Sequence, residues 1–161
     1  MKHALAMIAV TGMVLSSGAS AAELSKGADR ITVVKKETNI VREAQRPNAT
    51  SAEYGYAPRV TLSFPSTIVG GVDTNGTMTW RDPDNKVTRV FLTVFFHDGD
   101  VGTVSLFDVR DGDNAASSGR ITFAITAAGY DPNLGSNGTV IVTVTDQDYN
   151  VTQMSTSFVV R

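Results

Sequence analysis

The sequence predicts an all-β protein, an antiparallel β-sandwich of about seven strands with a flexible N-terminal extension. Three observations lead to this prediction. From Pro58 onward, apolar and polar residues alternate with the period of two that a half-buried strand requires. Gly, Asn and Asp residues interrupt the alternating runs roughly every 8–12 residues, as turns do. No stretch in this region has the period of an amphipathic helix.

The alternation is clearest at the C-terminal end of the chain. Val140, Val142 and Val144 point to one face of a predicted strand, and the residues between them point to the other. The Asp- and Asn-rich stretch 146–150 predicts a turn. A second β-rich run follows, with Met154, Thr156, Phe158 and Val160 on one face. The chain therefore ends in a predicted β-hairpin.

Five further strands are predicted upstream, at residues 59–64, 76–80, 86–96, 102–109 and 119–127. Residues 86–96 are almost continuously apolar, which is typical of a strand covered on both faces and predicts a central position in its sheet. The inward positions of all these strands make up the predicted core: Val60, Leu62, Met78, Trp80, Val90, Leu92, Val94, Leu106, Ile121, Phe123, Ile125, Val140, Val142, Val144 and Phe158.

The composition changes near residue 54, because every aromatic side chain lies at Tyr54 or beyond. Residues 22–53 are rich in charged residues, Ala, Asn and Gln, and bury too little apolar surface to offset the entropy of ordering. Residues 31–34 and 40–41 are the exception and predict one short strand or an amphipathic turn. The sequence thus divides into a signal peptide at 1–21, a flexible or conditionally ordered extension at 22–57, and a sandwich domain at 58–161.

Residues 1–21 have the three parts of a secretory signal peptide. Lys2 and His3 form a basic start, residues 4–15 are apolar, and residues 19–21 form a small-residue cleavage site. The apolar run is shorter than the roughly 20 residues that span a bilayer, and no Cys follows it for a lipid anchor. We expect a mature chain that starts at Ala22 or Glu23, is secreted or periplasmic, and has no transmembrane segment. The short Ala-rich form is typical of bacteria.

Composition excludes several classes of function. The 161 residues contain no Cys, which rules out disulfides, a thiol nucleophile and Cys-based zinc sites. The net charge is −2, and no basic patch of the kind that nucleic acid requires is visible. From Pro58 onward all 11 acidic residues are Asp.

Two hairpins resemble those of a known class of module. Residues 77–90, with Asp-Pro-Asp-Asn in the middle, look like the B–C hairpin of bacterial immunoglobulin-like and cadherin-like modules. Residues 140–160 are similar to the F–G hairpin of these modules, with Asp146 and Asn150 retained and Tyr149 in the place of a Gly. The resemblance implies the immunoglobulin-like form of the sandwich and points to no particular partner.

Paired aspartates in three predicted turns are candidate calcium ligands: Asp82, Asp84, Asp111, Asp113, Asp146 and Asp148. In an up-and-down order of strands these turns lie at one end, where they offer the oxygen ligands that calcium prefers. Six carboxylates placed together repel one another unless a cation or solvent screens them. The alternative is that these residues only form turns, because Asp and Asn side chains mimic backbone hydrogen bonds. Calcium is the one cofactor that the sequence suggests.

Two other candidates are weaker. Tyr130 and Tyr149 lie in turn regions and predict either a platform for sugar rings or caps over the core. His97, beside Asp98 and Asp100, would be the histidine of a hydrolase, but no Gly-x-Ser-x-Gly motif supplies a nucleophile. The sequence therefore predicts a protein that is not an enzyme.

The function predicted from these patterns is an exported, non-catalytic binding or structural module of the periplasm or cell surface. Its partner would be a protein or a surface polysaccharide met in trans. One alternative is a self-assembling fibre or matrix subunit, in which residues 31–41 add as a strand to a neighbour's sheet. The other is a carbohydrate-binding module.

Overall fold

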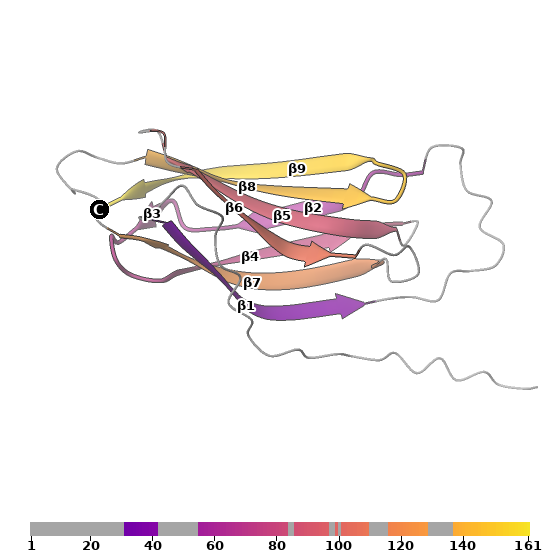
Figure 1. The fold of residues 1–161 in the computed structure, drawn as a ribbon, viewed down its shortest axis with the longest axis horizontal. Helices are drawn as coiled ribbons and strands as arrows, with labels where there is room; N and C mark the ends of the chain where they lie inside the picture. Colours follow the sequence, from indigo (N-terminus) through magenta and orange to yellow (C-terminus); the bar gives the residue numbers. More distant parts are fainter. Residues whose placement is uncertain are drawn as a thin grey trace, which may run out of the picture.

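The computed structural model describes residues 31–41, 55–83, 86–96, 99, 101–109, 116–128 and 137–161. These residues form nine strands: β1 (Ile31–Val41), β2 (Arg59–Ser63), β3 (Thr67–Ile68), β4 (Thr74–Arg81), β5 (Val87–Phe96), β6 (Val101–Asp108), β7 (Ser118–Ala127), β8 (Asn137–Asp146) and β9 (Val151–Val160). Two sheets pack face to face, one in the order β1-β7-β4-β2 and the other in the order β3-β9-β8-β5-β6 (Figure 1). The predicted immunoglobulin-like β-sandwich is confirmed. The signal peptide prediction lies outside the described residues.

All strand pairs are antiparallel except β3 with β9. Strand β5 pairs with β6 on one side and β8 on the other, so its predicted position inside a sheet is correct. The expected cover on both faces is wrong. Val90, Leu92 and Val94 are fully buried, but Phe95 is 37% exposed on the opposite face. Apolar residues on that face gave the run its continuous appearance.

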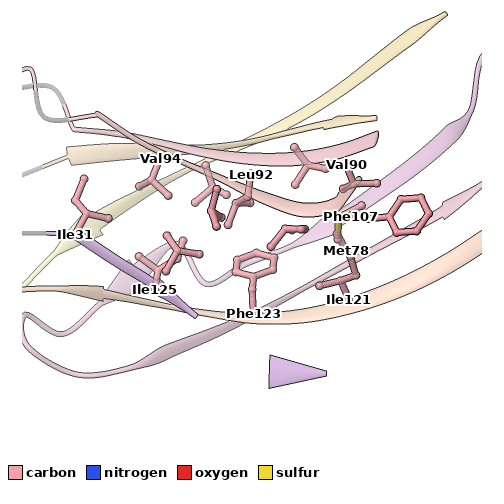
Figure 2. Close-up of a cluster of buried hydrophobic side chains, with 14 of the residues drawn as sticks. Ile31, Met78, Val90, Leu92, Val94, Phe107, Ile121, Phe123 and Ile125 are labelled. Carbon is pink, nitrogen blue, oxygen red and sulfur yellow. The ribbon is translucent and has the colours of Figure 1, made fainter. Parts of the chain in front are cut away.

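The core lies between the two sheets and includes the predicted residues (Figure 2). Val60 and Leu62 are only partly buried, because β2 is the edge strand of its sheet. Met154 shares a face of β9 with the buried Phe158 and Val160 but is 40% exposed. It pairs with Val142, but on its other side β9 is paired only at Val159 and Val160, so the strand is an open edge at Met154.

Three glycines in the strands each lie directly across from a large aromatic residue. The pairs are Gly76 with Phe123, Gly119 with Trp80, and Gly138 with Phe158. A Cβ atom added at these glycines would lie 2.1–2.4 Å from a ring atom of the partner. The rings therefore occupy the space that a side chain at the glycine would fill, which explains why glycine interrupts otherwise regular strands.

The predicted short strand near residue 31 is a full strand, β1, which pairs with β7 from Ile31–Ala127 to Val41–Ser118. Ile31 and Val33 are buried in the core. The Lys35 side chain donates a hydrogen bond to the Leu106 carbonyl oxygen on β6 at 3.3 Å, which links the two sheets. The sandwich thus includes a strand well upstream of Pro58, where the change in composition placed its start.

Candidate functional site

The three connections that carry the candidate calcium ligands begin and end at the same end of the sandwich. Val87, at the start of β5, pairs with Asp146 at the end of β8 and bridges to Ala116 before β7. The Asp82 amide, just after β4, donates to the Ser117 carbonyl oxygen at 2.7 Å. The flanks of the three connections therefore meet. Asp84, Asp111 and Asp113 lie outside the described residues.

Asp146 is buried and organises the β8–β9 turn. Its Oδ1 accepts a hydrogen bond from the Asn150 backbone N–H at 2.8 Å, and its Oδ2 accepts one from Asn150 Nδ2 at 2.9 Å. Tyr149 has a φ of 63°, the left-handed conformation that favours glycine, at the position where the resembling modules carry Gly. The carboxylate of Asp146 provides the hydrogen-bond acceptors that hold this turn.

Asp82 plays a similar part in the β4–β5 turn. It is buried, and its Oδ2 accepts the Lys86 backbone N–H at 2.9 Å. Lys86 then joins the two turns, since its Nζ lies 2.6 Å from Asp148 Oδ2 and its carbonyl oxygen accepts the Gln147 N–H at 2.9 Å. A lysine cation thus compensates part of the acidic charge at this end. Among the described residues, no three His, Cys, Asp or Glu side chains gather as metal ligands.

We expect Asp146→Ala to lower the free energy of unfolding by about 1–3 kcal/mol, because it removes the buried carboxylate that accepts two part-buried hydrogen bonds from Asn150. Asp148→Ala is the matched control. It removes one surface ion pair and should change stability by less than about 1 kcal/mol. Denaturant unfolding measures both variants. Equal losses would contradict the turn role of Asp146.

The same measurements in calcium and in chelator test the cation site, which remains a prediction. A site would stabilise the wild type by about 2.7 kcal/mol at a calcium concentration of 100 times Kd. Magnesium should do much less, because it holds its waters. The calcium effect should disappear in Asp82→Asn/Asp146→Asn, which removes ligand charge and keeps residues that form turns. If the wild type unfolds identically in calcium and in chelator, there is no calcium site, and these carboxylates serve only to form the turns.

Tyr149 is 84% exposed at the tip of the β8–β9 turn, so it does not cap the core. Its proposed partner in a sugar platform, Tyr130, lies outside the described residues, as does His97. Carbohydrate binding by these two tyrosines therefore stays a prediction, and the structure shows one of the two rings, that of Tyr149, to be exposed.

The outer face of the five-stranded sheet is a candidate surface that the sequence pattern did not predict. The strand registers place three rows of side chains across it: Val101–Phe95–Thr139–Ser157, Thr103–Thr93–Ile141–Ser155, and Ser105–Phe91–Thr143–Gln153. We call these twelve residues the neutral face. None of them is charged, and Phe95 and Val101 are both exposed. The signal in the sequence is the polar half of each alternation, which Phe91 and Phe95 conceal because they make residues 86–96 almost continuously apolar.

Hydroxyl contacts order the neutral face. The side-chain oxygens of Thr93 and Thr103 are 3.1 Å apart, and Gln153 Nε2 donates to Thr143 Oγ1 at 3.0 Å. The charged residues described beside the rows are Arg89 near the start of β5 and Asp108 at the end of β6, which are cross-strand partners and form an ion pair at 3.7 Å. The surface is uncharged, and it combines apolar groups with hydroxyls.

No protein-family model matches the chain, and no curated protein matches its sequence. The solved structures to which it is similar include the SrpA adhesin of Streptococcus sanguinis, with 13% identity, a TM-score of 0.41, and coverage of 72% of this chain and 60% of that one. The CARDB domain of the PF1109 protein of Pyrococcus furiosus has 13% identity and a TM-score of 0.37, over 68% of this chain and 98% of that one. BcpA, the major pilin subunit of Bacillus cereus, has 9% identity and a TM-score of 0.38, over 64% and 39%.

These similarities concern the β-sandwich fold alone. The chain spans 60% of the SrpA structure and 39% of the BcpA structure. No helix that is long and apolar enough to cross a bilayer occurs in the part of the chain that the structure describes.

Proposed function

We propose that the protein is an exported, non-catalytic β-sandwich module that binds a protein partner in trans through its neutral face. The single observation that supports this most is the absence of charge from the three rows of that face, together with the exposed Phe95 and Val101. The cores of protein interfaces are depleted in charge and enriched in aromatic residues. Thr and Ser hydroxyls beside the apolar groups can satisfy polar atoms of a partner without burying a charge.

Export rests on residues 1–21, whose basic start, apolar run and small-residue site have the form of a cleaved signal peptide. N-terminal sequencing of the protein from a periplasmic or secreted fraction should give Ala22 or Glu23 as the first residue. A chain that still begins at Met1 would contradict export by this route.

Site-specific photo-crosslinking in cells tests the docking face. A benzoylphenylalanine in place of Phe95 should give a discrete protein adduct, and Thr93→Lys in the same chain should abolish it, because the lysine charge would be buried in the interface. The control is the same probe in place of Thr77, which lies on the outer face of the other sheet. Equal adducts from both positions, or none from position 95, would overturn the proposal.

A second candidate, strand donation between copies, is favoured by the position of β1. Val41, Ser118, Arg81 and Arg59 are successive cross-strand partners, so the end of β1 lies about 14 Å from the start of β2. The 17 residues that join them could extend to about 55–60 Å. A connection of this length would also let β1 pair with β7 of a neighbouring copy, and the strand contacts would be the same.

Polar contacts would hold β1 equally well in either arrangement. Thr126 on β7 donates a hydrogen bond to Asp73, and Lys36 of β1 lies 3.6 Å from the other oxygen of that carboxylate. The Thr126 hydroxyl, and to a lesser extent Lys36, hold the pKa of Asp73 below its ordinary value.

The absence of Cys from the chain makes the donation test simple. Thr32 and Thr126 are cross-strand partners, so Thr32→Cys and Thr126→Cys place two thiols side by side wherever β1 meets β7. If the strand is donated, an oxidised mixture of the two single variants should contain disulfide-linked dimers. A mixture that stays monomeric, beside a double variant that closes within one chain, would exclude donation.

A further inference from the structure

Three arginines lie in a row on the outer face of the four-stranded sheet, the side of the sandwich opposite the neutral face. Arg59 on β2 pairs directly with Arg81 on β4. Arg120 on β7 pairs with Thr79, which places it diagonally across from Arg81. Direct partners have Cβ atoms about 5 Å apart, and diagonal neighbours are about 7–8 Å apart. We call these three residues the arginine row.

No ion pair among the described residues gives the arginine row a role in the fold. All three side chains are exposed, and within the described residues none of the three has an acidic partner. Arg89 on the other sheet, by contrast, pairs with Asp108. Like charges placed directly across a sheet are destabilising, so the Arg59–Arg81 pair weakens the edge that it joins. The row thus brings three positive charges together on one sheet of a chain whose net charge is −2.

The chemistry of the row fits an oxyanion. A guanidinium binds carboxylate or sulfate through two parallel hydrogen bonds, and three of them on neighbouring strands match a ligand that carries repeated negative charges. The other solvent-accessible residues on the outer face of β2, β4 and β7 carry hydroxyl or amide groups: Thr61, Ser63, Asn75, Thr77, Thr79, Ser118, Thr122 and Thr126.

No aromatic residue is among these side chains, and that sets the class of partner. Protein interfaces depend on buried aromatic anchors, and single-stranded nucleic acids stack on aromatic rings. A surface of guanidinium and hydroxyl groups instead suits a hydrated polymer that carries both acid and hydroxyl groups. We propose that the arginine row binds an anionic polysaccharide, with its acid groups on Arg59, Arg81 and Arg120 and its hydroxyls on the neighbouring threonines.

Binding of the mature chain to immobilised polygalacturonate tests this proposal, with dextran sulfate and uncharged dextran as the other ligands. Comparison of polygalacturonate with dextran sulfate shows whether the row prefers carboxylate or sulfate, and uncharged dextran should not bind.

The variants test the three arginines one by one. We expect each of Arg59→Gln, Arg81→Gln and Arg120→Gln to weaken binding about two- to fivefold, as for exposed ion pairs, and the triple variant at least about tenfold. Arg89→Gln is the matched control and should bind like the wild type. Added salt should weaken the wild type far more than the triple variant.

The unfolding midpoint provides an independent readout. Because Arg81→Gln removes a like-charge pair, it should leave the midpoint unchanged or raise it. A triple Arg→Lys variant keeps the charge but cannot form the two parallel hydrogen bonds of a guanidinium. It should bind with an affinity between those of the wild type and the triple Gln variant.

Four results would overturn the proposal. Two concern the ligand: a wild type that binds neither acidic polysaccharide, or one that binds polyglutamate or oligo-dT, used as competing polyanions, more tightly than either polysaccharide. Two concern the variants: a triple Gln variant that binds as tightly as the wild type, or a loss of affinity in Arg89→Gln equal to that in the triple variant. Because the row and the neutral face lie on opposite sheets, failure here leaves the proposed docking face untouched.

Discussion

Phe123→Ala is expected to lower the free energy of unfolding by about 3–5 kcal/mol, a large part of the 5–15 kcal/mol that stabilises a typical domain. Phe123 is fully buried, fills the space above Gly76, and stacks on Phe64 with ring centroids 6.0 Å apart. The strands β1 and β4 on either side of β7 hold the neighbouring backbone, so the cavity left by the ring can relax only in part.

Phe95→Ala is the matched control, since it removes the same ring from the outer side of the other sheet. Phe95 is 37% exposed, and we expect a loss of no more than about 1 kcal/mol, the range of ordinary surface substitutions. Denaturant unfolding of the two variants under identical conditions measures the difference. Losses of similar size would mean that the inward and outward faces of the sheets have been assigned wrongly.

Deletion of residues 22–41 is expected to leave a chain that does not fold stably by itself. The deletion removes the buried side chains of Ile31 and Val33, each of which contributes about 1.5–3 kcal/mol by burial. It also removes the ladder from Ile31–Ala127 to Val41–Ser118 and leaves β7 as an unpaired edge. The combined loss is comparable to the whole stability of a small domain.

Circular dichroism and thermal unfolding would follow this change, with deletion of residues 22–29 as the control that leaves β1 complete. A synthetic peptide of residues 30–42 should restore the fold of the truncated chain, since β1 needs only the free side of β7 and the core beneath it. A truncated chain with the unfolding midpoint of the control would show that β1 contributes nothing to the sandwich.

The sequence predicted correctly those features that depend on local spacing. Side chains in a strand alternate between its two faces, so the inward positions of Val140, Val142 and Val144 follow from the residue order alone. The same holds for Ile121, Phe123 and Ile125 on β7. The turn at 146–150 was also visible, because Asp and Asn are suited to it whatever surrounds them.

Features that depend on the neighbouring strand could not be read from the order of residues. Met154 lies on the same face of β9 as the buried Phe158 and Val160. It is exposed because β9 is an open edge at that position. The order of residues could not show that Phe95 faces outward without a covering layer, nor that a glycine lies beneath each of Phe123, Trp80 and Phe158.

The candidate sites divide in the same way. The sequence alone identified Asp82 and Asp146 as candidates, because a carboxylate in a turn can bind either a cation or a backbone N–H. Only the folded turns show that Lys86 and Asn150 are the donors to them. The arginine row joins residues 59, 81 and 120, and the neutral face joins four strands, so neither exists before the strands pair. Residue order determines which face of its own strand a side chain takes, since that depends on the geometry of a single backbone. Which side chains share a surface depends on hydrogen bonds between distant segments, and only the tertiary structure decided those.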